Sequence, residues 1–218
     1  MKKALFLSIL AIFANVGLMA QTNLNKFHQL KEEFATPNVY HAASGAPGHQ
    51  YWQQKADYSI AIRLDDEKQR LYGEETITYH NESPDELSYL WVQLDQNMRA
   101  KDSDRYKVSP SEMKDQMSAS SLSRIEPDFD GGFKLDKVQD TKGLALRYTV
   151  NGTMMRIDLP SKLKSKGSYS FKIKWWYNIN NHITMGGRSG YEYFPDDDNY
   201  FYIIAQFFPR MADYNGID

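Results

Sequence analysis

The 218-residue chain contains no cysteine, so it can form neither a disulfide framework nor a metal site built on thiolates. It also lacks a marked excess of one charge: 26 lysine and arginine residues stand against 28 aspartate and glutamate residues, a net charge of -2. This balance offers no basic surface of the kind that nucleic acids need. We therefore expect a fold that depends on its hydrophobic core, and no nucleic-acid partner.

Long apolar runs are absent except at the N-terminus. Lys2 and Lys3 precede the apolar run Ala4–Ala14, and Val16–Ala20 ends in a small residue suited to signal-peptide cleavage. The alternative is a transmembrane anchor, but this run is shorter than the ~20 apolar residues that a bilayer span needs. The pattern predicts a signal peptide over residues 1–20 and a secreted or periplasmic protein, with no membrane attachment after cleavage.

Motifs that build hydrolytic active sites are missing as well. The zinc motif H-E-x-x-H needs two histidines one helical turn apart, and none of the five histidines has a partner at that spacing. The nucleophile motif Gly-x-Ser-x-Gly is absent, and no nucleophile–base–acid set is evident. We therefore predict no catalytic residue, no metal ligand and no bound cofactor in this chain.

Three kinds of loop could in principle hold a ligand. His41 and His49 flank a glycine-rich stretch, and the acidic groups Asp196–Asp198 and Asp128–Asp136 carry oxygen ligands of the kind that calcium uses. Neither acidic group has the EF-hand spacing, so we favour solvated turns and exposed histidines. Gly186–Gly190 lacks the Lys-Ser/Thr of a phosphate-binding loop, and we interpret it as a turn that needs positive φ angles.

What is present is a high content of aromatic residues, with 15 Tyr, 11 Phe and 4 Trp, and a hydrophobic period of two from Tyr51 onward. The alternation predicts a hairpin, a leucine-rich strand, a second hairpin around Asn151-Gly152 and a long strand with Tyr169, Phe171, Ile173, Trp175 and Tyr177 on one face. The ranges of these predicted strands are 58–64, 71–79, 87–94, 144–150, 154–159 and 168–179.

The predicted fold class is mostly β: an antiparallel β-sandwich with a short N-terminal helix and one inserted helix. Residues 21–50 are predicted to form a lead-in helix and linker, and residues 51–218 one β-sandwich domain. Ser109-Pro110-Ser111-Glu112 is typical of a helix start, so the inserted helix is expected from residue 109 to about residue 123. Residues 200–208 are apolar on both faces, which favours a central strand.

Two segments near the end carry a family resemblance: Glu192-Tyr-Phe-Pro and Ala205-Gln-Phe-Phe-Pro-Arg-Met. Together with the long hairpin and the leucine-rich strand, they resemble the N-terminal domain of secreted bacterial zinc metallopeptidases of the aminopeptidase N family, the gluzincins. The resemblance implies a saddle-like β-sandwich truncated at Asp218, before a catalytic domain that is missing here. For the intact protein it implies a zinc cofactor and the hydrolysis of a peptide substrate.

The resemblance also implies one site residue, Gln206, as a substrate-binding residue. In the family, a polar Gln or Glu on this last strand faces the active-site cleft and binds the amino terminus of the substrate. In the best-known members that residue lies two positions further on, where Phe208 stands. The alternative for Gln206 is a strand amide that is hydrogen-bonded within the sheet. The alternative for the whole chain is a free-standing secreted β-sandwich that binds glycan or protein.

Overall fold

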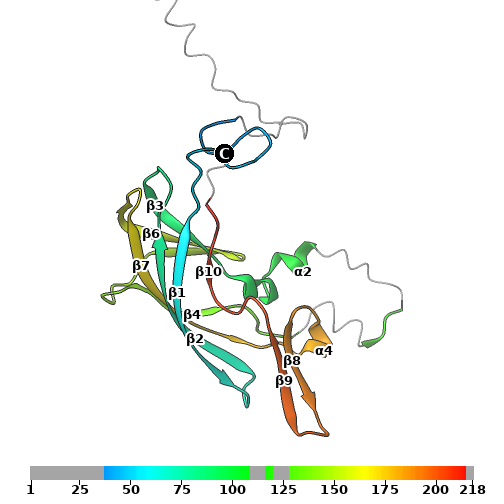
Figure 1. Ribbon diagram of the computed structural model, residues 1–218. Helices are drawn as coiled ribbons and strands as arrows, with labels where there is room; N and C mark the ends of the chain where they lie inside the picture. Colours follow the sequence, from blue (N-terminus) through cyan, green and yellow to red (C-terminus); the bar gives the residue numbers. More distant parts are fainter. Residues whose placement is uncertain (1–36, 109–115, 120–127, 215–218) are drawn as a thin grey trace, which may run out of the picture. The chain divides into compact units, whose positions relative to one another are not determined.

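The computed structural model describes residues 37–108, 116–119 and 128–214 (Figure 1). The predicted signal peptide and lead-in helix lie outside these ranges. The chain divides into two compact units, of which the larger runs from Trp52 to Gly216. No helix in the described ranges is both long and apolar enough to span a membrane.

The described part of the smaller unit, residues 37–51, is a closed loop. An isolated bridge joins His41 to Pro47, and the backbone N–H of Gly48 donates to the carbonyl of Tyr40 at 2.7 Å. A Cβ on Gly48 would lie 2.3 Å from the carbonyl oxygen of Val39, so only glycine fits at this position. The glycine-rich stretch therefore folds back on itself by its own backbone hydrogen bonds.

Two antiparallel four-stranded sheets and a hairpin make up the larger unit (Figure 1). Of the described residues, 49% lie in strands and 8% in helices, so the fold is mostly β, as the sequence predicts. The first sheet has the order β1 (Lys55–Asp65), β2 (Arg70–His80), β7 (Ser168–Asn178), β4 (Lys134–Asp140). The second has the order β10 (Arg210–Met211), β3 (Leu87–Gln93), β6 (Met154–Leu163), β5 (Tyr148–Asn151). The hairpin pairs β8 (Ser189–Phe194) with β9 (Asn199–Ile204).

The helices of the described ranges are short. They are the 3₁₀ helix η2 (Asp95–Arg99) and the α-helices α2 (Asp104–Val108) and α4 (His182–Met185). The inserted helix predicted from residue 109 lies mostly outside the described residues, and α2 ends immediately before it.

The inner faces of the two sheets form one hydrophobic core, and the predicted alternation is confirmed. Leu90 and Val92 of β3 are buried, as are Phe171, Ile173 and Trp175 of β7. At one position the packing is so close that only a glycine fits. Gly73 lies opposite Trp175, and a Cβ at Gly73 would come within 2.2 Å of the indole ring. This contact explains why a glycine, which weakens an isolated strand, stands in the middle of β2.

The predicted central strand at residues 200–208 is wrong. The strand β9 ends at Ile204 and pairs with β8 alone among the described strands. One face of the hairpin packs through Tyr202, whose hydroxyl donates to Gln69 Oε1 at 2.8 Å. The opposite face, which includes Phe201 and Ile203, is exposed. Apolar residues on both faces therefore reflect one face that packs at Tyr202 but is open at Tyr200 near the tip, and one open face, rather than burial inside a sheet.

A carboxyl group lies inside this core without a hydrogen-bond partner. Glu75 of β2 is 1% exposed, and neither of its carboxyl oxygens makes a hydrogen bond with a described residue. Burial raises the pKa of Glu75 from 4.5 to about 8. The Trp175 indole offsets only part of that rise, since its N–H does not reach hydrogen-bond geometry. Glu75 is therefore neutral in the folded protein below about pH 8.

This pKa shift predicts a stability that falls as the pH rises. Below pH 4.5 Glu75 is protonated in both the folded and the unfolded chain, so its contribution to stability is fully present there. Between pH 4.5 and about 8 only the unfolded chain ionises, which reduces the free energy of unfolding by up to about 5 kcal/mol. Glu75→Gln should remove this pH dependence in urea unfolding measured from pH 4 to 9.

The matched control is Glu74→Gln, because Glu74 is the neighbouring residue on the exposed face of β2. Its pH profile should follow that of the wild type. A Glu75→Gln profile that also follows the wild type would contradict a neutral buried carboxyl.

Candidate functional site

The candidate site is built on the crossing segment, Ala205–Ala212, which contains most of the residues that carry the family resemblance. The segment leaves β9 and runs to the edge of the second sheet, where β10 pairs with the end of β3 (Figure 1). The backbone N–H of Met211 donates to the Tyr58 hydroxyl of β1 at 2.8 Å, and that of Ala212 donates to the Trp91 carbonyl of β3 at 2.9 Å. The crossing segment thus bridges both sheets at one edge of the sandwich.

Gln96 fixes the start of this segment. Its Nε2 donates to the carbonyls of Ala205 and Gln206, both at 3.1 Å, and its Oε1 accepts from Arg99 Nη1 at 3.1 Å. Gln96 is 3% exposed, so its side chain makes these three bonds largely out of contact with water. Gln96 lies in η2, directly after the leucine-rich strand β3.

The second half of the crossing segment is held by an ion pair and by aromatic packing. Arg210 Nε donates to Asp95 Oδ2 at 2.9 Å, and its Nη2 reaches Asp95 Oδ1 at 3.4 Å. The Phe208 ring packs edge-on against Tyr58, with 5.4 Å between centroids. Burial raises the pKa of Tyr58, and the nearby Glu75 adds to the rise. The Tyr58 hydroxyl therefore stays protonated while it accepts the Met211 N–H.

Gln206 lies beyond the last strand residue of β9, in a left-handed backbone conformation with φ of 51°. Its side chain is exposed, while its carbonyl is bonded to Gln96. The alternative of a strand amide bonded within the sheet is therefore wrong. Two positions further on, Phe208 is half-buried against Tyr58 and contributes no polar group. The resemblance implies a substrate-binding residue on the last strand, whereas Gln206 lies in a bend after β9.

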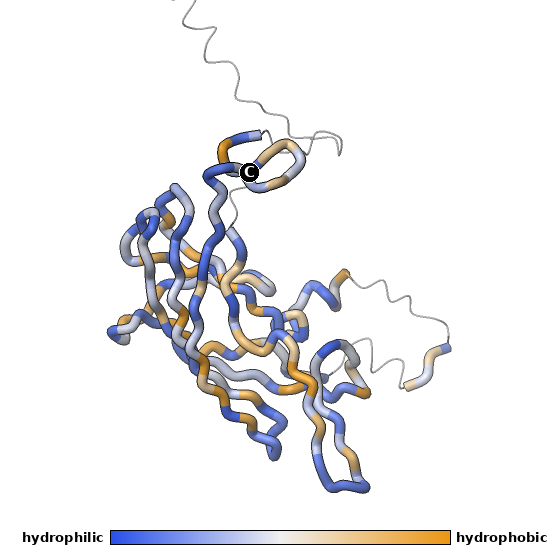
Figure 2. The backbone as a smooth tube through the Cα atoms, viewed as in Figure 1, coloured by the Kyte–Doolittle hydropathy of each residue, from blue (hydrophilic) through white to orange (hydrophobic). Residues whose placement is uncertain are grey.

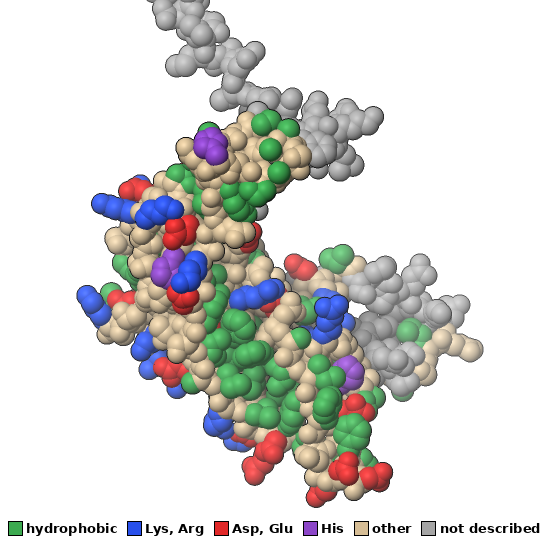
Figure 3. Space-filling view, in the orientation of Figure 1, with side chains coloured by type: hydrophobic (Ala, Val, Ile, Leu, Met, Phe, Trp, Pro, Cys, Tyr) green, Lys and Arg blue, Asp and Glu red, His purple; other side chains and the backbone are tan. Residues whose placement is uncertain are grey.

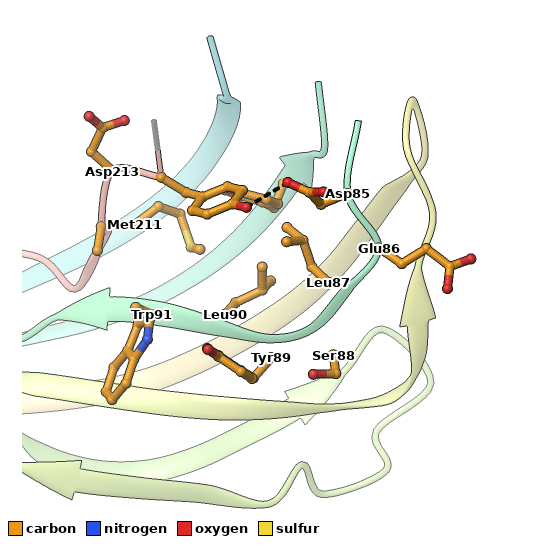
Figure 4. Close-up of a pocket in the computed structure, with 12 residues that line it drawn as sticks. Asp85, Glu86, Leu87, Ser88, Tyr89, Leu90, Trp91, Met211 and Asp213 are labelled. Atoms are coloured by element: carbon orange, nitrogen blue, oxygen red, sulfur yellow. Dashed lines mark hydrogen bonds between the residues drawn. The ribbon is translucent and has the colours of Figure 1, made fainter. Parts of the chain in front are cut away.

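A cleft of about 390 Å³ lies beside the end of the crossing segment (Figure 4). Leu87, Leu90 and Met211 lie on one side of β3, whereas Tyr89 and Trp91 lie on the other (Figure 4). The lining also brings in three carboxylates, two from the β2–β3 loop and one from the chain after β10. The lining residues are Tyr79, Asp85, Glu86, Leu87, Ser88, Tyr89, Leu90, Trp91, Met211, Ala212, Asp213 and Tyr214.

Hydrogen bonds and burial shape the electrostatics of this cleft. The Tyr214 hydroxyl donates to Asp85 Oδ2 at 2.8 Å (Figure 4). Burial raises the pKa of Tyr79, and the charge of Asp213 and the Tyr214 phenol raise it further. The cleft is therefore acidic, with aromatic walls, and its chemistry suits the binding of a cation more than proton transfer near neutral pH.

The acidic loops considered for calcium are occupied by other interactions. Asp128 pairs with Lys101 and Asp130 with Lys134, each at 2.7 Å. Asp198 accepts a hydrogen bond from the Tyr193 hydroxyl at 2.7 Å in the turn between β8 and β9. No group of three or more His, Asp or Glu side chains is placed to hold a metal within the described ranges.

The two remaining loop predictions have different outcomes. Gly186 and Gly187 follow α4 with φ of 62° and 92°, so the prediction of positive φ angles is confirmed. His41 packs edge-on against Tyr51 at 5.4 Å between centroids, a contact that needs no metal.

The residues that hold the site together, Asp95 and Gln96, give no signal in the sequence. They stand in a region that carries neither a recognisable motif nor a regular hydrophobic period. Their contacts with the crossing segment span 109 to 115 positions in the chain. Only the packing of the sheets brings these side chains to their partners.

Comparisons with known proteins do not identify this chain. No family model matches it, and no curated protein matches it. A crystal structure of a GH20 exo-β-N-acetylglucosaminidase from Vibrio harveyi in complex with N-acetylglucosamine is similar at 12% identity and a TM-score of 0.27. The match covers 72% of this chain and 17% of that chain, and so weak a likeness carries no argument.

The contacts of Gln96 predict how the crossing segment is held. Gln96→Ala removes three hydrogen bonds, of which the one to Arg99 is buried and the two to the carbonyls of Ala205 and Gln206 are partly buried. We expect a loss of about 3 kcal/mol in the free energy of unfolding by urea, together with faster trypsin cleavage after Arg210. Gln93→Ala serves as the control, since Gln93 ends β3 and its side chain makes no hydrogen bond with a described residue. Equal trypsin rates for the two variants would contradict the role of Gln96.

Proposed function

We propose that this chain is the non-catalytic N-terminal domain of an exported zinc metallopeptidase of the aminopeptidase N type, which hydrolyses peptide bonds as the intact protein. The observation that carries the proposal is the crossing segment. The residues with the most specific resemblance are tied to both sheets through backbone bonds to Gln96, Tyr58 and Trp91, and the Gln206 side chain remains exposed. Such a segment can form one wall of a cleft that another domain completes.

The open face of the β8–β9 hairpin supports this proposal. Phe194, Phe201 and Ile203 share that face and are 43%, 55% and 38% exposed. Figure 3 shows hydrophobic side chains gathered on the viewed side of the molecule, with acidic side chains near the hairpin tip. The tube in Figure 2 likewise turns from hydrophilic at the tip to hydrophobic where β9 leads into the crossing segment. Exposed apolar surfaces of this kind suit a packing partner, and in this proposal that partner is the catalytic domain of the intact protein.

The residues present do not fit the zinc site of a gluzincin. The motif H-E-x-x-H is absent from the sequence, and the described ranges contain no cluster of three metal-binding side chains. No step of the hydrolysis is therefore assigned to this chain. In the proposal, this chain helps to bind and orient the peptide substrate, and Gln206 is the residue that contacts the substrate.

A second candidate function is a free-standing secreted module that binds glycan or protein. It is favoured by the outer face of the second sheet, where Trp91 and Tyr89 are exposed and Arg156 lies over the Tyr89 ring at 4.1 Å. The DNA sequence downstream of codon 218 distinguishes the two candidate functions. A reading frame that continues past codon 218 into H-E-x-x-H supports the metallopeptidase, whereas a stop codon followed by a separate gene contradicts it.

The proposal predicts a division of activity between the fragment and the complete reading frame. Purified residues 21–218 should retain no stoichiometric zinc after dialysis against a weak chelator and should hydrolyse no aminoacyl substrate, because the ligands are absent. The protein expressed from the complete reading frame should do both. In that protein, Gln206→Ala should lower kcat/KM about tenfold, and Gln50→Ala, which replaces another exposed glutamine, should leave it unchanged. One equivalent of zinc retained by residues 21–218 would contradict the assignment.

The exposed hairpin face predicts that the fragment associates in solution. Residues 21–218 should form soluble oligomers on size-exclusion chromatography and bind a hydrophobic dye, since apolar surface without its packing partner favours self-association. Replacing Phe201 and Ile203 by serine should reduce both signals. Ile183→Ser is the control, because Ile183 is exposed on α4 outside the hairpin. A monomer that does not bind the dye would contradict the claim that the hairpin face lacks its packing partner.

A further inference from the structure

A second hollow lies on the solvent-facing side of the second sheet and shares Trp91 with the cleft beside the crossing segment. Its volume is about 400 Å³, and its lining comes from β3, β5, β6 and the residue before β5. The strand register aligns the side chains in rows across the sheet. Trp91 is opposite Arg156, which is opposite Thr149, and Tyr89 is opposite Asp158. The hollow is therefore built on paired strands, which hold its side chains at fixed spacings.

The floor of the hollow offers one flat aromatic ring. Trp91 is 39% exposed, and Tyr89 touches it edge-on at 6.2 Å between centroids. The Arg156 guanidinium lies over the Tyr89 ring at 4.1 Å, which leaves the Trp91 face without a cation from the described residues. The first sheet offers a contrast, because there Arg70 covers the Trp176 ring at 4.1 Å.

Polar groups without strong partners surround the Trp91 ring. The Arg147 side chain is 87% exposed, and its Nε lies 3.7 Å from Asp158 Oδ2, a long distance for an ion pair. Arg156 is the closer partner of Asp158, with its Nε 2.9 Å from Oδ1. The Thr149 hydroxyl and the Asn151 amide make no hydrogen bond with described residues. Two guanidinium groups against one carboxylate leave the hollow with one excess positive charge. A ligand with a flat apolar face, several hydroxyls and one acidic group would complement all of these features.

We propose that this hollow binds an acidic saccharide, one that carries a uronic acid. A sugar ring has an apolar face of C–H groups that can lie on the Trp91 ring, and its hydroxyls can bond Thr149 and Asn151. The carboxylate of the sugar can accept two parallel hydrogen bonds from Arg147, the geometry that a guanidinium favours. A nucleic acid would need many cations along its backbone, and the chain carries a net charge of -2.

The test uses residues 21–218 and two probes of equal size, a trimer of galacturonic acid and the neutral galactose trimer of the same linkage. Isothermal titration and tryptophan fluorescence should detect the acidic trimer at least about tenfold more tightly than the neutral one. Arg147→Met should remove that preference, and because Arg147 is so exposed, the variant should fold as the wild type does. Trp91→Ala should weaken binding about tenfold, with thermal unfolding monitored to show that it folds.

The matched control is Trp176→Ala, which removes the solvent-facing tryptophan of the other sheet and should leave binding unchanged. Several results would overturn the proposal: no binding of the acidic trimer, equal binding of the neutral trimer, or an Arg147→Met variant that keeps the preference. Loss of binding in Trp176→Ala as well as in Trp91→Ala would also contradict it, since it would place the ligand elsewhere.

Discussion

The interaction on which the rest of the structure depends is the attachment of the crossing segment to Gln96. Two sheets that share a core leave apolar surface open where their edges do not meet, and here Ala205–Ala212 covers that edge between β1 and β3. Gln96 bonds the backbone carbonyls at the start of the segment, and the side chains of Phe208 and Arg210 hold its second half. This attachment allows Phe208 to pack inward while Gln206 remains exposed.

The sequence predicts the strands in the middle of the sheets better than it predicts the strands at the edges and in the hairpin. Strands with one buried face, such as β2 and β7, follow the period of two, because burial selects every second residue. The strand β4 escapes the pattern, since a register irregularity between Leu135 and Lys137 breaks the alternation. The prediction for β9 is wrong because an apolar face that is open to solvent and an apolar face that is packed have the same pattern in the sequence.

The candidate site is less predictable than the fold for the same physical reason. Gln206 can be chosen only through resemblance, whereas its exposure follows from a positive φ and a carbonyl bonded to a distant side chain. The buried carboxyl of Glu75 continues the apolar alternation of β2 as if it were a leucine, so no sequence rule distinguishes it. Contacts between residues about 100 positions apart decide both cases.

The central claim is that the crossing segment is a fixed part of the sandwich rather than a loose tail. Amide hydrogen exchange of residues 21–218 tests it most directly, because Met211 and Ala212 each donate one backbone hydrogen bond to a different sheet. The account predicts that these two amides exchange as slowly as those in the middle of β3. Exchange as fast as that of the exposed turn residue Glu67 would contradict it.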